Sequence, residues 1–107
     1  MPHPNTPRVR RGQLVTVAGD VLRLDTPAWF AWLHTVSSFS YSSSQSSWRL
    51  TVRRDKRRRQ TYWYGYAKND GKLYNVYLGK TEQLTQANLE AACERLRKKV
   101  RLERRWE

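Results

Sequence analysis

A run of cations and a run of aromatic residues lie side by side in the middle of this 107-residue chain. From Arg53 to Tyr66 the sequence reads R-R-D-K-R-R-R-Q-T-Y-W-Y-G-Y, with six cations in seven residues followed by four aromatics in five. Guanidinium and ammonium groups neutralise phosphates, and aromatic faces stack on bases or pack a small core. The combination predicts a nucleic-acid partner, although it does not indicate which base sequence that partner carries.

The charge distribution supports the same class of partner. The formal net charge is +12 and the isoelectric point is near 10.6. Residues 46–80 hold ten cations and two carboxylates, whereas the segments before and after them each carry an excess of two cations. So high a charge destabilises a compact chain by self-repulsion, which a polyanionic partner would relieve.

Residues that could support catalysis or bind a metal are scattered. His3 lies near the N-terminus and His34 near the end of a predicted helix, and neither has a second ligand at metal-binding spacing. The lone Cys93 fits a helical pattern as a small buried apolar side chain. Four aspartates coincide with predicted turns, and turn chemistry explains them: Asp20, Asp25, Asp55 and Asp70. We therefore expect a protein that is not an enzyme and uses no cofactor or metal.

The ends and the apolar content of the chain bound its organisation. Three prolines in the first seven residues predict a disordered basic tail over residues 1–12, followed by one nucleic-acid-binding domain over residues 13–107. No apolar run approaches a membrane span, and the start lacks the apolar core of a secretory signal. With a single cysteine, these features predict a cytoplasmic protein without a membrane partner, associated with the nucleoid if it binds DNA.

The N-terminal part of the domain predicts a hairpin and a short helix. Residues 13–24 place β-forming residues on both sides of Ala18-Gly19-Asp20, which is typical of a hairpin. Thr26 then precedes Pro27, an arrangement that favours an N-cap and first helical position. The apolar residues that follow recur at helical spacing: Trp29, Trp32, Leu33 and Val36.

The serine-rich segment 37–47 allows two interpretations. Its composition alone predicts a flexible linker. However, Phe39 and Tyr41 alternate with serine at period two, which favours a short edge strand that runs into a serine-rich loop.

Residues 48–100 predict three strands and a helix. Alternation predicts strands over 48–52, 62–67 and 73–78, with the basic run as the loop of the first hairpin and Asn69-Asp70-Gly71 as the second turn. From Thr85, a predicted N-cap, five apolar residues recur at helical spacing: Leu89, Ala92, Cys93, Leu96 and Val100. The predicted fold class is α+β: an N-terminal β-hairpin and short helix, then a three-stranded antiparallel sheet packed on a C-terminal amphipathic helix.

The two faces of this sheet have different compositions. The face predicted to meet the helix consists of Trp48, Leu50, Val52, Trp63, Gly65, Ala67, Tyr74, Val76 and Leu78. Gly65 and Ala67 are small enough to let a helix approach, so we expect Tyr62, Tyr64 and Tyr66 to point away from it. The face away from the helix therefore combines tyrosines with cations, hydroxyls and an amide.

Several of these segments resemble known bacterial modules. The pieces P-A-W-F-A-W-L, S-F-S-Y, Y-W-Y-G-Y and Y-L-G-K resemble, over residues 14–102, a module near the N-terminus of LuxR-type, MalT-like ATP-dependent transcriptional regulators. The three strands and helix resemble the arm-type DNA-binding domains of tyrosine integrases and plant ethylene-response proteins. This resemblance implies transcription regulation or a mobile element, with a sheet in the major groove. The chain has no P-loop, helix-turn-helix or recombinase catalytic set, so only a stand-alone module is implied.

We therefore predict a double-stranded DNA-binding protein. The integrase resemblance implies groove contacts from Arg49, Thr51, Arg53, Tyr62, Tyr64, Tyr66 and Asn75. The basic loop residues Lys56, Arg57, Arg58 and Arg59 would hold flanking phosphates, and Arg54 and Lys68 complete the predicted nucleic-acid site. Two alternatives stay open: RNA or single-strand binding by tyrosine stacking, and a protein-interaction module within a larger complex. A merely solvated loop and ordinary β-propensity are the simplest explanations of the two runs.

Overall fold

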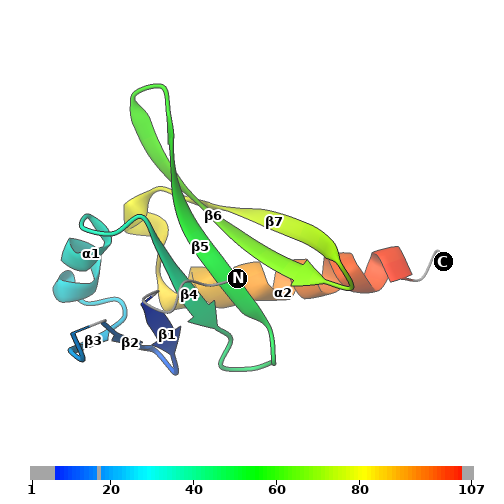
Figure 1. The fold of residues 1–107 in the computed structure, drawn as a ribbon, viewed down its shortest axis with the longest axis horizontal. Coiled ribbons are helices and arrows are strands. Elements are labelled where there is room, and N and C mark those ends of the chain that lie inside the picture. The colour runs from blue at the N-terminus through cyan, green and yellow to red at the C-terminus, as the bar shows by residue number, and fades with distance from the viewer. Residues whose placement is uncertain (1–6, 17, 105–107) are drawn as a thin grey trace.

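The computed structural model describes residues 7–16 and 18–104. Its elements, in chain order, are β1 (Arg8–Arg10), β2 (Gln13–Val15), β3 (Val21–Arg23), α1 (Pro27–Leu33), β4 (Ser38–Ser42), β5 (Arg49–Arg57), β6 (Gln60–Asn69), β7 (Lys72–Gly79), the 3-10 turn η1 (Thr81–Gln83) and α2 (Gln86–Arg104). Figure 1 shows α2 running along one side of the strands, with α1 beside the end formed by β3.

All seven strands belong to one mixed sheet with the order β3-β2-β1-β4-β5-β6-β7. Strands β1 and β4 pair in parallel, and every other neighbouring pair is antiparallel. The predicted three-stranded antiparallel sheet is therefore wrong, although helices and strands do combine around one sheet. The physical reason is that β4 has two hydrogen-bonding edges, one for β5 and one for β1, and so joins the N-terminal hairpins to the sheet.

Strand β1 corrects the prediction of a disordered tail over residues 1–12. Arg8–Arg10 pair with β2 and β4, and Val9 between them is fully buried. Arg11 and Gly12, both with positive φ, make the tight turn into β2. Residues 1–6 of the predicted tail lie outside the described residues. The prolines before it indicated disorder, but pairing with β2 on one side and with the distant β4 on the other orders this strand.

The predicted hairpin and helix that follow are confirmed. Strands β2 and β3 pair antiparallel, and Thr26 caps α1 by accepting a 3.3 Å hydrogen bond from the Trp29 amide. Trp29 is fully buried, and its indole donates a 2.7 Å hydrogen bond to the Leu84 carbonyl. Helix α1 ends at Leu33, so Val36 packs against the core from the segment beyond it.

Strand β4 confirms that the serine-rich segment is a strand that runs into a loop, and corrects the linker interpretation and the predicted edge position. Ser38–Ser42 is neither a linker nor an edge strand but an interior strand between β1 and β5. Phe39 and Tyr41 are buried on the core side, and the Phe39 ring lies 5.8 Å from that of Trp63. Burial of these two aromatic rings outweighs the weak strand preference of serine.

The basic run is mostly strand rather than loop. Strand β5 continues to Arg57 and β6 begins at Gln60, so only Arg58 and Arg59 form the turn. Arg58 has a φ of 57°, a left-handed conformation that lets a two-residue connection reverse the chain. The second predicted turn is confirmed, with Asp70 and Gly71 at positive φ between β6 and β7.

Helix α2 covers one face of the sheet as predicted. The Thr85 hydroxyl accepts a 3.2 Å hydrogen bond from the Asn88 amide at the N-terminus of α2, and the five predicted apolar residues of the helix are buried. Leu50, Val52 and Trp63 are buried beneath it, which confirms the predicted core face. Trp29 of α1 packs against Phe39, so both helices lie on this side. No helix of the described residues covers the opposite face.

Candidate nucleic-acid interface

The uncovered side of the sheet, called here the outer face, is built by alternation. Residues of β5, β6 and β7 that flank the buried positions point to it, and directly paired residues share a side. Arg53 lies opposite Tyr64, Thr51 opposite Tyr66, and Tyr66 opposite Asn75. Of the predicted site residues, the structure therefore brings these together on the outer face: Arg49, Thr51, Arg53, Tyr62, Tyr64, Tyr66, Lys68 and Asn75.

Residues 55–62 form a two-stranded ribbon, called here the basic arm. The pairing of β5 with β4 ends at Arg53, and the pairing of β6 with β7 ends at Trp63. Beyond these residues β5 and β6 pair only with each other, and Figure 1 shows their hairpin standing clear of the rest of the molecule. The basic arm carries four exposed cations, namely Lys56, Arg57, Arg58 and Arg59.

Cations occupy both sides and the tip of the basic arm. Arg57 pairs with Gln60 on the side continuous with the outer face, whereas Lys56 pairs with Thr61 on the other side. Asp55 is the only carboxylate of the arm, and its oxygen lies 3.9 Å from the Arg57 guanidinium, between two side chains that are at least half exposed. Such a loose surface pair adds little stability, and four cations against one carboxylate leave the arm with a net charge of +3.

Three tyrosines form a cluster at the base of the basic arm. The Tyr77 ring centre lies 5.4 Å from that of Tyr64 and 6.0 Å from that of Tyr62. The Arg57 guanidinium lies over the Tyr64 ring at 5.1 Å from its centre, and the Tyr62 hydroxyl donates a 2.7 Å hydrogen bond to Gln60. The rings therefore support one another, and Tyr77 retains the most exposure, at 49%.

Arg54 does not join the outer face. It pairs with the buried Trp63 and so points to the side of the helices, where its guanidinium donates a long 3.5 Å hydrogen bond to the His34 carbonyl. The sequence analysis placed Arg53 among the groove contacts and added Arg54 to the predicted site without assigning it to a face. In a strand, adjacent residues point to opposite faces.

The outer face also contains polar residues that sequence reasoning missed. Alternation about the buried residues of β1 and β4 places them beside Arg49 and Arg53, and they are Arg8, Arg10, Ser38, Ser40 and Ser42. The signal was available in R-V-R and S-F-S-Y-S, which alternate with period two. It was overlooked because the prolines and serines around these strands indicated disorder.

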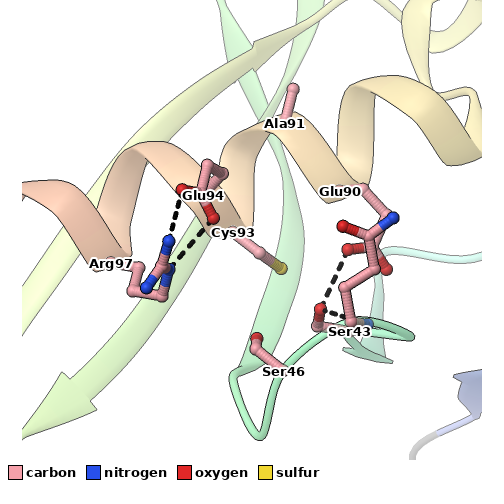
Figure 2. Close-up of a pocket in the computed structure, with 8 residues that line it drawn as sticks. Ser43, Ser46, Glu90, Ala91, Cys93, Glu94 and Arg97 are labelled. Atoms are coloured by element: carbon pink, nitrogen blue, oxygen red, sulfur yellow. Dashed lines mark hydrogen bonds and ion pairs between the residues drawn. The ribbon is translucent and has the colours of Figure 1, made fainter.

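A separate open hollow of about 420 Å³ lies between α2 and the loop after β4. Figure 2 shows Glu90, Glu94 and Arg97 on α2 facing this loop, with Cys93 between them. Glu94 and Arg97 form a salt bridge of 2.6 Å. Burial raises the pKa of the Cys93 thiol to about 12, so the thiol stays protonated and the predicted structural role of Cys93 is supported.

Glu90 of α2 forms hydrogen bonds with β4 and with the loop that follows it. Its carboxylate accepts hydrogen bonds of 2.6 Å from the Tyr41 hydroxyl, 2.9 Å from the Ser43 hydroxyl and 2.6 Å from the Ser44 amide. Burial acts to raise the pKa of Glu90, but these hydrogen bonds outweigh it and the net pKa is lowered. Burial, together with Glu90, raises the pKa of Tyr41. A stable carboxylate beside a protonated phenol anchors the helix to the strand and leaves no poised acid or base.

Among residues 7–16 and 18–104, no three His, Cys, Asp or Glu side chains gather to hold a metal ion. Neither helix in this described part of the chain is long and apolar enough to cross a membrane.

Comparison with protein-family models, curated proteins and solved structures finds no match to this chain. The likeness to LuxR-type regulators and integrase arm domains therefore stays a prediction from short motifs.

Proposed function

We propose that this protein binds double-stranded DNA without catalysing a reaction on it. The basic arm would enter the major groove, and the outer face would lie against the adjacent sugar–phosphate backbone. The observation that carries this proposal is the basic arm: a two-stranded ribbon, clear of its neighbours, with four exposed cations and one carboxylate.

The width of the sheet decides which part can enter a groove. The major groove of B-DNA is about 12 Å wide and admits a two-stranded ribbon. Neighbouring strands lie about 4.8 Å apart, so seven strands span roughly 29 Å and cannot enter together. The integrase resemblance implied that the sheet face enters the major groove, but here only the basic arm is narrow enough to do so. The outer-face residues Arg49, Thr51, Arg53, Tyr66, Lys68 and Asn75 would contact the backbone instead.

The cations of the arm are placed to contact the phosphate backbones on both sides of the major groove. Lys56 and Arg57 point to opposite sides of the ribbon, so each would approach the phosphates of a different DNA strand. Arg58 and Arg59 at the turn would reach deepest, where a guanidinium can form two hydrogen bonds with a guanine edge.

The tyrosine cluster supports a second candidate, single-stranded nucleic acid. Half of the Tyr77 surface is exposed on an open face, where a base could stack. However, Tyr62 and Tyr64 pack against Tyr77, and Arg57 covers Tyr64, which leaves less ring surface free. The cluster therefore favours support of the arm over base stacking.

Binding measured with matched probes tests the proposal. Fluorescence anisotropy would compare duplex DNA, single-stranded DNA and RNA of equal length over a series of salt concentrations. For about five neutralised phosphates, log K should fall with log salt at a slope of roughly −4 to −5, with duplex DNA preferred. The double variant Lys56→Ala/Arg59→Ala should reduce the steepness of this slope by about 2.

The matched control is Lys98→Ala/Lys99→Ala, which removes the same charge from exposed positions on α2. It should leave the slope nearly unchanged. A slope near zero for the parent protein, or an equal effect of the two double variants, would contradict the proposal. If the parent protein binds none of the probes, the protein-interaction alternative takes its place.

A further inference from the structure

The serines of β4 form a low line across the outer face. Ser38, Ser40 and Ser42 alternate with the buried Phe39 and Tyr41 and so point away from the helices. Ser38 and Ser42 are partly exposed, whereas Ser40, between them, is buried at 8% exposure. Successive side chains on one face of a strand are about 6.7 Å apart, close to the step between phosphates along a nucleic-acid strand. Because serine side chains are short, the strands on either side stand higher than β4.

Arginines flank this line on both sides. In the register of β4 with β5, Ser42 lies opposite Arg49 and Ser38 opposite Arg53. On the other side, Ser40 is in register with Arg8 of β1. Since β1 and β5 are two strand spacings apart, the arginine rows are separated by roughly 10 Å at their backbones. We call the three serines and their flanking arginines the serine track: Ser38, Ser40, Ser42, Arg8, Arg10, Arg49 and Arg53.

The groups of the serine track have no partner among the described residues. None of the three serine hydroxyls takes part in a hydrogen bond with another described residue, and no described carboxylate forms a salt bridge with the four arginines. Serine is also a poor choice for an interior strand, where β-branched residues stabilise the sheet better. Small hydroxyl donors between two rows of free guanidinium groups are complementary to a phosphodiester chain.

We propose that the serine track holds the sugar–phosphate backbone of one DNA strand, with the hydroxyls of Ser38 and Ser42 beneath it, the buried Ser40 keeping the floor low between them, and arginines on both sides. This inference rests on the proposed function. It adds which part of the DNA the protein holds, namely one sugar–phosphate backbone, and that this backbone runs along β4. Strand β5 is adjacent to β4 and continues into the basic arm. The held backbone would therefore border the groove that the arm enters.

Two carboxylates placed in the track test this inference. In Ser38→Asp/Ser42→Asp, each new carboxylate lies opposite an arginine of β5, Arg53 or Arg49. The new pairs should let the variant fold while they neutralise the arginines that would contact phosphate. Its matched control is Ser46→Asp/Ser47→Asp in the exposed loop after β4, where Ser46 lines the hollow beside α2. Both variants change the net charge equally. The track variant should bind duplex DNA about tenfold or more weakly than the control, with a salt slope reduced by roughly 2.

A second variant keeps the test decisive if the first is unstable. Arg8→Gln/Arg10→Gln removes one side of the track at exposed positions and should also reduce the steepness of the salt slope by about 2. If the parent protein binds duplex DNA but neither track variant differs from the loop control, the serine track is overturned and the proposed function stands. If the parent protein does not bind duplex DNA, both proposals fail.

Discussion

The guanidinium of Arg57 lies over the ring of Tyr64, 5.1 Å from its centre. This contact joins the basic arm to the outer face, because Arg57 is the last residue of β5 and Tyr64 lies in the body of the sheet. An exposed cation–π contact of this kind contributes about 0.5–1 kcal/mol. The pair therefore helps to orient the arm and at the same time covers a ring that could otherwise stack on a base.

The covered ring distinguishes the two modes of nucleic-acid binding. If the protein binds duplex DNA through the arm, Tyr64→Ala should weaken binding by about fivefold at most, because only the support of Arg57 is lost. If the tyrosines stack on unpaired bases, the same change should cost about 1–3 kcal/mol, or roughly 5- to 150-fold. Titration of duplex and single-stranded probes measures the difference.

Tyr66→Ala is the comparison variant for this test, since Tyr66 shares the outer face but lies beside Asn75 rather than under an arginine. A large loss of single-strand affinity in both variants would favour the stacking mode.

The contact between Tyr41 and Glu90 predicts an acid-sensitive fold. The pKa of Glu90 is lowered in the folded state from its usual 4.5, so its contribution to stability is complete above that value. It is lost as the pH falls through the lowered folded pKa. The melting temperature should therefore decrease below about pH 4.5, and Glu90→Gln should show a smaller decrease.

At neutral pH, Glu90→Leu should lower the free energy of unfolding by about 1–3 kcal/mol, because the Tyr41 hydroxyl, on a side chain that is 1% exposed, loses its acceptor. Glu82→Leu is the control, since Glu82 is exposed and its carboxylate bonds to no described residue. Equal effects of the two changes in denaturant titrations would argue against the anchoring role of Glu90.

Gly79 at the end of β7 should not tolerate a side chain. It has a φ of 110°, and a Cβ there would overlap the Gln83 side chain, which accepts a 2.9 Å hydrogen bond from the Lys80 amide. Gly79→Ala should therefore lower the free energy of unfolding by about 1–3 kcal/mol or more. Chemical denaturation measures this change directly.

Gly71→Ala provides the control, because Gly71 also has positive φ but its Cβ would meet nothing within 4 Å. Gly79→Ala should have the lower free energy of unfolding of the two, because the Gln83 side chain must move and its hydrogen bond with the Lys80 amide is disturbed. The same stability in both would mean that Gln83 moves aside without loss.

Local patterns predicted much of the core and some of the candidate interface. The alternation of Leu50 and Val52, the N-caps at Thr26 and Thr85 and the apolar face of α2 all depend on neighbouring residues, and the structure confirms them. The assignment of the tyrosines to the face away from the helix also follows from alternation. Each of these features depends on residues within about one helical turn or a few strand positions.

The position of β4 and the reach of the basic arm depend on pairing between distant segments. Whether Ser38–Ser42 lies at an edge or in the interior depends on β1, some 30 residues away in the chain, and on a parallel register that no local pattern encodes. The length of the arm depends on where β4 and β7 stop pairing rather than on its own charged composition. Highly charged residues favour loops by composition, but the backbone hydrogen bonds between β5 and β6 extend the strands through them.

The sequence by itself determined that this protein concentrates positive charge and aromatic residues in its middle third, because charge and residue type do not depend on the fold. Only the tertiary structure decided which of these residues lie on the outer face, on the basic arm or on the side of the helices. Strand pairing separated Arg53 from Arg54, isolated the basic arm and placed the serines of β4 between two rows of arginines. The reason is physical: a side chain's face follows from local alternation, whereas its neighbours across the sheet follow from hydrogen bonds between segments that the chain order does not specify.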